Sequence, residues 1–236
     1  LQEGYYSDRT VATAMPSERV TFIQRTYGHL AGAILAFAGL ETLLIMSGIG
    51  EQIVRQMFTG TGGLLVVMLL FIGGGYLAQY WARSATSRAM QYAGLGLYVV
   101  LEAVIFLPLL IIAAIYTDQS IIPKAALLTL GVFAGLTMAV FMTGKDFSFM
   151  RTGLIMAGWA SVGLIVVAMI FPINLGTWFS FAMVGLAAAY IIYDTSNVMH
   201  HYRSDQHVAA ALVLFASVAL LFFYILRILL ANSRRN

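Results

Sequence analysis

Four ionisable side chains lie inside long apolar stretches of this sequence. They are Glu41, Glu102, Asp194 and Arg227. A charged residue at the centre of a membrane helix costs about 2.5–3.5 kcal/mol on insertion scales, so such residues tend to face protein or water and to mark ion or proton sites. The chemistry that these side chains could support is therefore proton exchange, cation contact or a buried ion pair.

Asp194 is the strongest functional candidate. Tyr190, Asp194 and Asn197 follow three- and four-residue spacing, which places them on one face of a helix. We expect Asp194 to face the interior, next to the last apolar stretch. Two roles stay open for it, namely a structural ion pair or hydrogen bond, and a titrating or cation-contacting role. Arg83 ends an apolar stretch on the same predicted side, and its long side chain could reach Asp194.

Glu102 and Ser217 are expected at similar depth in the membrane. If the third helix begins near Gln91, Glu102 lies roughly 16 Å deep, close to the middle of the bilayer. Ser217 stands in the middle of the last apolar stretch. We expect Glu102 to lie in protein, paired with a hydroxyl or a backbone carbonyl, and to be neutral, because an unpaired buried charge is costly.

The other polar residues favour structural interpretations. Glu41 is expected to reach the interface near the outer end of the first helix, and Arg227 to anchor the outer end of the last helix or pair with an acid. A solvated turn is expected for three histidines, His200, His201 and His207. His29 is expected to be packed or interfacial. The pairs Gly28–Gly32 and Gly131–Gly135 fit the small-xxx-small pattern of close helix contact.

Several classes of active site are absent from the sequence. It has no Cys, no His-Glu-x-x-His motif and no Gly-x-Ser-x-Gly motif. Both lysines, Lys124 and Lys145, fall in connecting segments, which excludes a retinal Schiff base in the last helix. We therefore predict no catalytic residues, no cofactor, no metal site and no enzymatic activity.

The composition identifies the elements that must position these side chains. Of the 236 residues, 61% are hydrophobic and only 10% are charged, against roughly 25% charged in a soluble domain. A membrane-spanning helix needs about 20 apolar residues. Such stretches occur at 25–49, 62–82, 92–115, 125–143, 154–171, 178–199 and 208–230. They predict an all-α integral membrane protein, a seven-transmembrane-helix bundle over residues 25–236, preceded by a polar N-terminal cytoplasmic tail at 1–24.

The uncharged stretch 152–193 is too long for one helix, and the segment 171–176, with Pro172 and Gly176, divides it. Lys and Arg residues are more numerous in the loops on one side of the membrane, and the side with more of them is normally cytoplasmic. This predicts a cytoplasmic N-terminus and an external C-terminus. That side holds Arg9, Arg19, Arg25, Arg83, Arg88, Lys145, Arg151 and Arg203, and the other holds Arg55, Lys124, Arg234 and Arg235. Six spans with a re-entrant last segment remain the alternative. The net charge of +3 fits contact with anionic membrane lipids, without nucleic acid as a partner.

Three stretches carry a family resemblance. They are KDFSFM at 145–150 with LIMAG at 154–158, DTSNVMH at 194–200, and the last helix from ALVLF at 211–215. They resemble the Bax inhibitor-1 superfamily, and more closely its bacterial YccA-like branch. The resemblance covers most of the membrane region, although its specific motifs follow residue 140. It implies a bundle in which six helices surround the last, in the bacterial inner membrane.

The resemblance also implies roles for particular residues. Better-known members leak calcium or protons through two aspartates on the sixth and seventh helices, and an arginine ending the second helix latches the closed state. Asp194 matches the first aspartate and Arg83 the latch, whereas the second aspartate falls at Ser217, which cannot ionise. The acid that those members carry on the second helix is also missing, since Ile72 and Gly73 stand there.

Two functions follow from this comparison of motifs. The YccA-like branch also carries Ser at the second position, which implies binding and modulation of a membrane-bound AAA protease of the FtsH type, as partner and slowly degraded substrate. The retained Asp194 and Arg83 keep a pH-sensitive calcium or proton leak as the alternative. Glu102 is our own candidate to replace the lost carboxylate. With Ser217 in place, we expect weak calcium flux near neutral pH.

Overall fold

A computed structural model describes residues 10–84, 86–118, 120–171 and 173–233 of the chain. Expectations for Arg9, Pro172, Arg234 and Arg235, and for residues 1–9 of the tail, lie outside these ranges. Within them the chain is helical apart from short connections and one isolated β-bridge between Thr10 and Arg203.

The described residues form eight α-helices and two short 3-10 helices. The α-helices are α2 (Pro16–Met46), α3 (Ile49–Met57), α4 (Gly60–Ala82), α5 (Arg88–Tyr116), α6 (Ile121–Thr143), α7 (Arg151–Ile170), α8 (Gly176–His200) and α9 (His207–Ser233); the 3-10 helices are η1 (Val11–Thr13) and η2 (Ser148–Met150). All the α-helices except α3 are long and apolar enough to cross a membrane, seven in the described chain. This confirms the predicted all-α membrane class.

Two features of the N-terminal half differ from the expected elements. The first helix begins at Pro16, so residues 16–24 of the predicted tail are helical. Proline at the first helical position and Glu18 in the first turn both favour a helix start there. The short α3 was expected to be a loop. It follows Gly48, whose φ of 72° turns the chain back at the end of α2.

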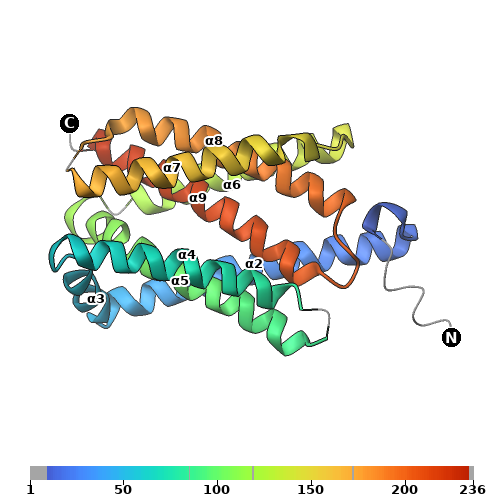
Figure 1. Cartoon of the computed structure of the whole chain (residues 1–236), viewed down its shortest axis with the longest axis horizontal. Coiled ribbons are helices and arrows are strands. Elements are labelled where there is room, and N and C mark those ends of the chain that lie inside the picture. The colour runs from blue at the N-terminus through green and yellow to red at the C-terminus, as the bar shows by residue number, and fades with distance from the viewer. Residues whose placement is uncertain (1–9, 85, 119, 172, 234–236) are drawn as a thin grey trace.

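Helix α9 occupies the centre of the bundle. It packs against α2, α4, α5, α6 and α8, and in Figure 1 it runs diagonally between the α2–α4–α5 group and the α6–α7–α8 group. Most of its length is buried, whereas α7 lies at the periphery and has hardly any fully buried residues. The expected central position of the last helix is therefore confirmed, although α7 packs on α8 and α4 and not on α9.

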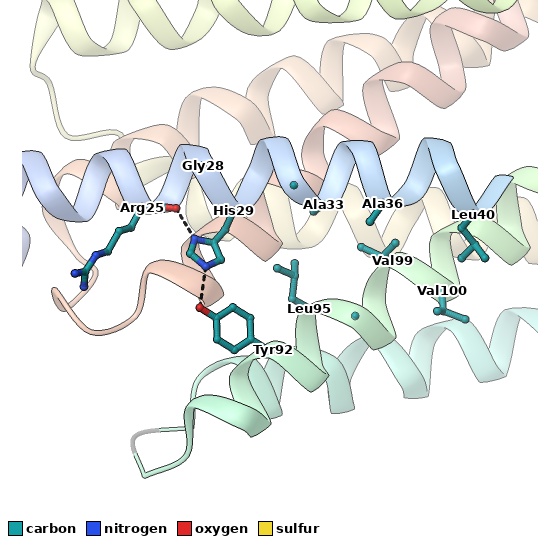
Figure 2. Close-up of a pocket in the computed structure, with 12 residues that line it drawn as sticks. Arg25, Gly28, His29, Ala33, Ala36, Leu40, Tyr92, Leu95, Val99 and Val100 are labelled. Atoms are coloured by element: carbon teal, nitrogen blue, oxygen red, sulfur yellow. Dashed lines mark hydrogen bonds between the residues drawn. The ribbon is translucent and has the colours of Figure 1, made fainter. Parts of the chain in front are cut away.

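The glycine pair on α2 does not mark a close helix contact. A Cβ atom added at Gly28 or Gly32 would meet nothing within 4 Å, and the same holds for Gly131 and Gly135 on α6. The expectation from their spacing was wrong, because the pattern shows where helices could approach, and no neighbouring backbone takes up that space. Gly28 and Gly32 instead line a pocket between α2 and α5 (Figure 2).

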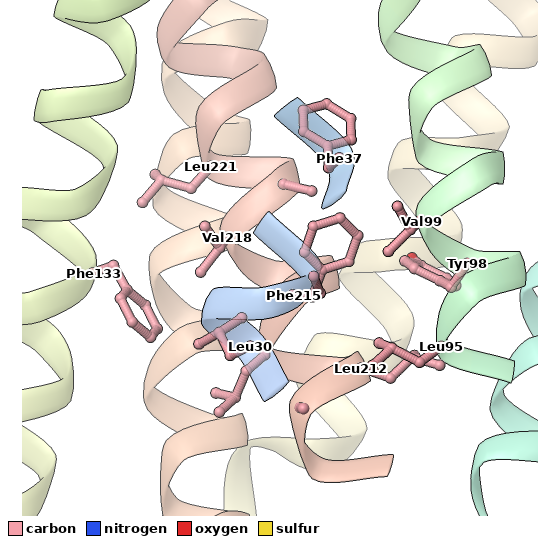
Figure 3. Packing of buried hydrophobic residues seen from close by; sticks show 14 of the residues in the cluster. Leu30, Phe37, Leu95, Tyr98, Val99, Phe133, Leu212, Phe215, Val218 and Leu221 are labelled. Atoms are coloured by element: carbon pink, nitrogen blue, oxygen red, sulfur yellow. The ribbon is translucent and has the colours of Figure 1, made fainter. Parts of the chain in front are cut away.

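The core is built from side chains that face α9 (Figure 3). Phe215 of α9 lies between Phe37 of α2 and Tyr98 of α5, with ring centroids 6.0 and 6.2 Å away and edge-to-face geometry. Phe106 of α5 packs edge-on against Phe37 at 5.0 Å. Aromatic pairs of this geometry are worth about 0.5–1.5 kcal/mol beyond their buried area, so they link α2, α5 and α9 firmly.

Gly94 allows a very close approach of α4 and α5. A Cβ atom there would lie 2.4 Å from the Ala78 carbonyl oxygen and 2.6 Å from the Ala82 backbone nitrogen, both on α4. Only glycine leaves room for this packing of α4 on α5. Since Arg83 directly follows α4, the contact also determines where Arg83 lies.

Candidate functional site

Asp194 lies in the interior beside α9, as the sequence predicts. Asp194 is only 8% exposed, and its carboxylate accepts a hydrogen bond of 2.5 Å from the Ser217 hydroxyl of α9. A hydroxyl thus stands directly against the carboxylate at the position where the resemblance places a second acid. Hydrogen bonds to charged groups contribute about 1.5–3 kcal/mol, so this contact ties α8 to α9.

The expected direct contact between Asp194 and Arg83 is not made among the described residues, where no ion pair joins them. Tyr202, just beyond α8, lies close to both. Burial raises the pKa of its hydroxyl, the charge of Asp194 raises that pKa further, and the neighbouring Arg83 opposes the rise. Arg83 therefore acts on Asp194 through space, with the Tyr202 side chain beside it.

Glu102 lies within protein, as expected, and is 6% exposed in the middle of α5. The Tyr98 hydroxyl, one helical turn earlier, lies beside its carboxyl group. Tyr98 is also within electrostatic range of Asp194, so this tyrosine lies near both acids. We call the set Arg83, Tyr202, Asp194, Ser217, Tyr98 and Glu102 the polar core line.

The predicted polar stripe on α8 divides between different partners. Tyr190 donates a hydrogen bond of 2.8 Å to the Leu154 carbonyl of α7, and not to the Asp194 carboxylate. Asn197 contributes through its backbone carbonyl, which accepts from the backbone N–H groups of His201 and Tyr202 at 2.8 and 3.2 Å. Its backbone therefore closes the end of α8 and places Tyr202. Shared spacing on α8 did not mean a shared site.

Two of the three stretches that carry the family resemblance, 145–150 and 194–200, contact each other. The Ser196 hydroxyl accepts a hydrogen bond of 2.9 Å from the backbone N–H of Phe147 and donates to the Lys145 carbonyl at 3.4 Å. The Asp146 carboxylate lies 3.0 Å from the His201 ring. We name these contacts the 146–201 clamp, because they join the end of α8 to the segment between α6 and α7.

The charge of the clamp is set by local hydrogen bonds. The backbone N–H of Ser148, 2.8 Å from Asp146, and then His201 hold the pKa of the Asp146 carboxyl below its usual range. His201 is therefore paired and not merely solvated, contrary to the expectation for this turn. His200 likewise bonds the Ser196 carbonyl at 2.9 Å.

The N-terminal segment covers the same end of the bundle. Val11 is completely buried, and its backbone N–H donates a hydrogen bond of 2.8 Å to the Tyr202 carbonyl. The β-bridge between Thr10 and Arg203 continues this contact. The segment therefore holds the backbone of the residue that lies beside Asp194 and Arg83.

Two expectations for single residues were wrong. Glu41 does not reach the interface: it is only 4% exposed, and neither of its carboxylate oxygens has a partner among the described residues. After α2 the chain folds back as α3, which packs against α2 and α5. Protein therefore also covers the end of α2 near Glu41, where the sequence predicted an exposed interface. His207 does not lie in a solvated turn; it begins α9, is buried, and its ring lies 5.0 Å from that of His29.

Arg227 is partly buried near the far end of α9. Its guanidinium lies 6.0 Å from the centre of the Phe179 ring of α8, a cation–π contact and not an acid pair. It adds a second link between α8 and α9, at the opposite end from the clamp.

Sequence reasoning missed three residues of this region, Tyr98, Tyr202 and Ser196. Tyr98 could have been found, because it precedes the singled-out Glu102 by one helical turn. Ser196 is two residues after Asp194 and on another side of the helix, and Tyr202 lies in a short connection. Only the fold brings these two to their partners.

The geometry defines a multi-pass helical membrane protein whose buried acids lie against its central helix. The chain belongs to the Bax inhibitor-1 family, since the family model described as "Inhibitor of apoptosis-promoting Bax1" matches residues 19–235. This confirms the predicted family. The polar core line and the 146–201 clamp both fall within the matched region.

Relatives extend over almost the whole chain. An uncharacterized protein of Pseudomonas aeruginosa is 29% identical over 235 residues, covering 97% of this chain and 96% of the relative. Mouse protein lifeguard 4 is 26% identical over 239 residues, with 100% and 95% coverage. Bax inhibitor 1 of Schizosaccharomyces pombe is 34% identical over 131 residues, which are 52% of this chain and 48% of that protein.

Proposed function

We propose that this protein binds and modulates a membrane-bound AAA protease of the FtsH type, without enzymatic activity of its own. The observation that carries the proposal is the 2.5 Å hydrogen bond from Ser217 to Asp194. It puts a neutral hydroxyl where the leak-forming members of the family have an acid, as the YccA-like branch does. The resemblance to that branch supplies the protease as partner and the bacterial inner membrane as location.

The same contact argues against ion conduction as the main activity. Calcium ions take six to eight oxygen ligands, usually including several carboxylates. Asp194 offers one carboxylate that is already hydrogen-bonded, and the Glu102 carboxyl group lies beside the Tyr98 hydroxyl. In the part of the chain that the structure describes, no three His, Asp or Glu side chains come together.

One observation favours a second candidate function, a pH-sensitive calcium or proton leak built around Asp194. The polar core line gathers hydroxyl and carboxyl groups of α5, α8 and α9 in the interior, and Tyr98 is within electrostatic range of both acids. A chain of hydroxyl and carboxyl groups is the kind of structure along which protons move through membrane proteins.

Reconstitution with a purified protease tests the first proposal. The chain and an FtsH-type protease are placed together in liposomes with a fluorescent membrane substrate and ATP. We expect substrate degradation to slow in the presence of the chain, and the chain itself to be degraded slowly. An unrelated multi-pass protein at the same protein-to-lipid ratio is the control. Degradation rates that are equal with the chain and with the control contradict the proposal.

The second candidate is tested in liposomes that contain the chain alone. Calcium and proton indicators then report flux without any protease. Strong flux that Asp194→Asn abolishes would establish the leak and would displace the first proposal.

A further inference from the structure

A groove runs between α2 and α5 on the outside of the bundle. Its volume is about 650 Å³, and Figure 2 shows Ala33, Ala36, Leu95 and Val99 along it. It has no part in the polar core line. Its walls are almost wholly apolar, and several of its residues are exposed on the face of the bundle that meets lipid.

Missing side chains create the space. Gly28 and Gly32 of α2 and Gly96 of α5 all line the groove, and a Cβ atom added at any of them meets nothing within 4 Å. An apolar cavity at hydrocarbon depth gives water few hydrogen-bond partners, so an apolar chain fills it more favourably.

One end of the groove is polar and fixed in place. The His29 Nδ1 atom donates to the Arg25 carbonyl at 2.6 Å, since a carbonyl can only accept, and its Nε2 atom lies 3.0 Å from the Tyr92 hydroxyl. The His29 and Tyr92 rings also stack, with centroids 5.5 Å apart. This contact ties the polar ends of α2 and α5 together at the mouth of the groove.

The same end is positively charged. The Arg25 guanidinium is exposed, and no carboxylate of the described residues lies within ion-pair distance of it. Arg25 and Arg88 both lie within electrostatic range of His207. The mouth therefore gathers several basic side chains and attracts an anion.

The length of the groove matches one leaflet of a bilayer. Arg25 and Leu40 mark its ends on α2, and fifteen residues of helix span roughly 22 Å. One leaflet including its headgroup region is about 20–22 Å thick, of which about 15 Å is hydrocarbon. With Arg25 at headgroup level, the apolar part of the groove runs alongside the acyl-chain region of that leaflet.

We propose that this groove binds an anionic phospholipid, with the phosphate at Arg25 and one acyl chain along the glycine-lined wall. The basic mouth selects an anionic headgroup over a zwitterionic one, because no carboxylate of the described residues pairs with Arg25, and the Asp205 carboxylate, which also lies within electrostatic range of His207, is paired with Arg203. The bound lipid fills the space between α2 and α5 that no side chain fills. Its binding is independent of any protease.

Lipid retention by the purified full-length chain tests this proposal. The protein is extracted in detergent, mixed with phosphatidylglycerol or phosphatidylcholine, and examined by native mass spectrometry and thermal unfolding. We expect retained phosphatidylglycerol and a higher unfolding midpoint with it than with phosphatidylcholine. Arg25→Gln should weaken phosphatidylglycerol retention about five- to tenfold, the usual effect of one basic residue near anionic lipid.

Variants that fill the groove separate the acyl-chain contact from the charge. Gly32→Leu should abolish retention of both lipids, and Ala36→Leu provides a second filling variant should the first fold poorly. Gly39→Leu is the matched control, because Gly39 is on the same helix, has open space around it and does not line the groove. Arg151→Gln removes one exposed charge at the same end of the bundle and should retain lipid normally.

Three results would overturn the proposal. Equal retention of the two lipids would indicate ordinary annular lipid. Equal losses in Arg25→Gln and Arg151→Gln would indicate a general charge effect. A dimer that holds no lipid and that Gly32→Leu dissociates would show that the groove holds a second copy of the chain.

Discussion

Replacing Ser217 with aspartate restores the second acid of the leak-forming family members at a defined distance from Asp194. The present hydroxyl lies 2.5 Å from the Asp194 carboxylate, so a carboxylate at position 217 would bring two negative charges to about 4 Å of each other. At an effective dielectric constant near 20 their repulsion is about 4 kcal/mol. This corresponds to roughly a thousandfold preference for the pair that shares one proton over the doubly charged pair.

We therefore expect Ser217→Asp to make α8 and α9 separate as pH rises and the shared proton leaves. Calcium flux into liposomes, measured with an enclosed indicator between pH 6 and pH 8, should be weak for the unaltered chain and should increase with pH for Ser217→Asp. Ser217→Asn, which adds similar volume without charge, is the matched control and should stay weak.

The opposite result would refute this reasoning. If the unaltered chain conducts calcium strongly near neutral pH and Asp194→Asn abolishes the flux, one carboxylate suffices and the leak becomes the better functional proposal. If Glu102→Gln also abolishes that flux, Glu102 supplies the second carboxylate that Ser217 does not.

The remaining predictions concern stability and are read from unfolding in detergent. Gly94→Ala should lower the unfolding midpoint strongly, because its Cβ atom would meet α4 backbone, whereas Gly96→Ala, with open space around it, should change the midpoint little. Ser196→Ala should cost about 1–3 kcal/mol by leaving the Phe147 N–H unpaired, and an unchanged midpoint would show that the clamp does not stabilise the fold. The pKa of Asp146 is lowered in the folded chain, so its charge stabilises the fold above about pH 4, and this stability is lost as pH falls through the lowered pKa. Asp146→Asn should remove this loss of stability in acid. A variant that still loses the same stability in acid would refute the assignment to Asp146.

The membrane-spanning helices were predictable because the bilayer imposes a length and an apolar composition on each of them. For six of them the helix limits differ from the expected spans by no more than four residues at either end. The first helix is longer because hydropathy marks only the part within lipid, and helix signals such as Pro16 lie outside it.

The buried acids were also visible in the sequence, because a charge in an apolar stretch stands out whatever the fold. Their partners were not visible. Glu41 was expected at the interface, and its burial depends on α3, an element that hydropathy does not detect. Hydrogen bonds that link segments far apart in the chain depend on how helices pack, and spacing along one helix carries no information about this.

The amino-acid sequence by itself determined the all-α membrane class, the number of membrane-spanning helices, and which ionisable residues would be costly to bury without a partner. It did so because desolvation acts on each residue and each helix separately. Only the tertiary structure decided that Asp194 meets Ser217, that Tyr98 lies near both Asp194 and Glu102, and that Gly28 and Gly32 open a groove. These outcomes depend on which helix faces lie against each other, a property of the packed bundle and not of any single segment.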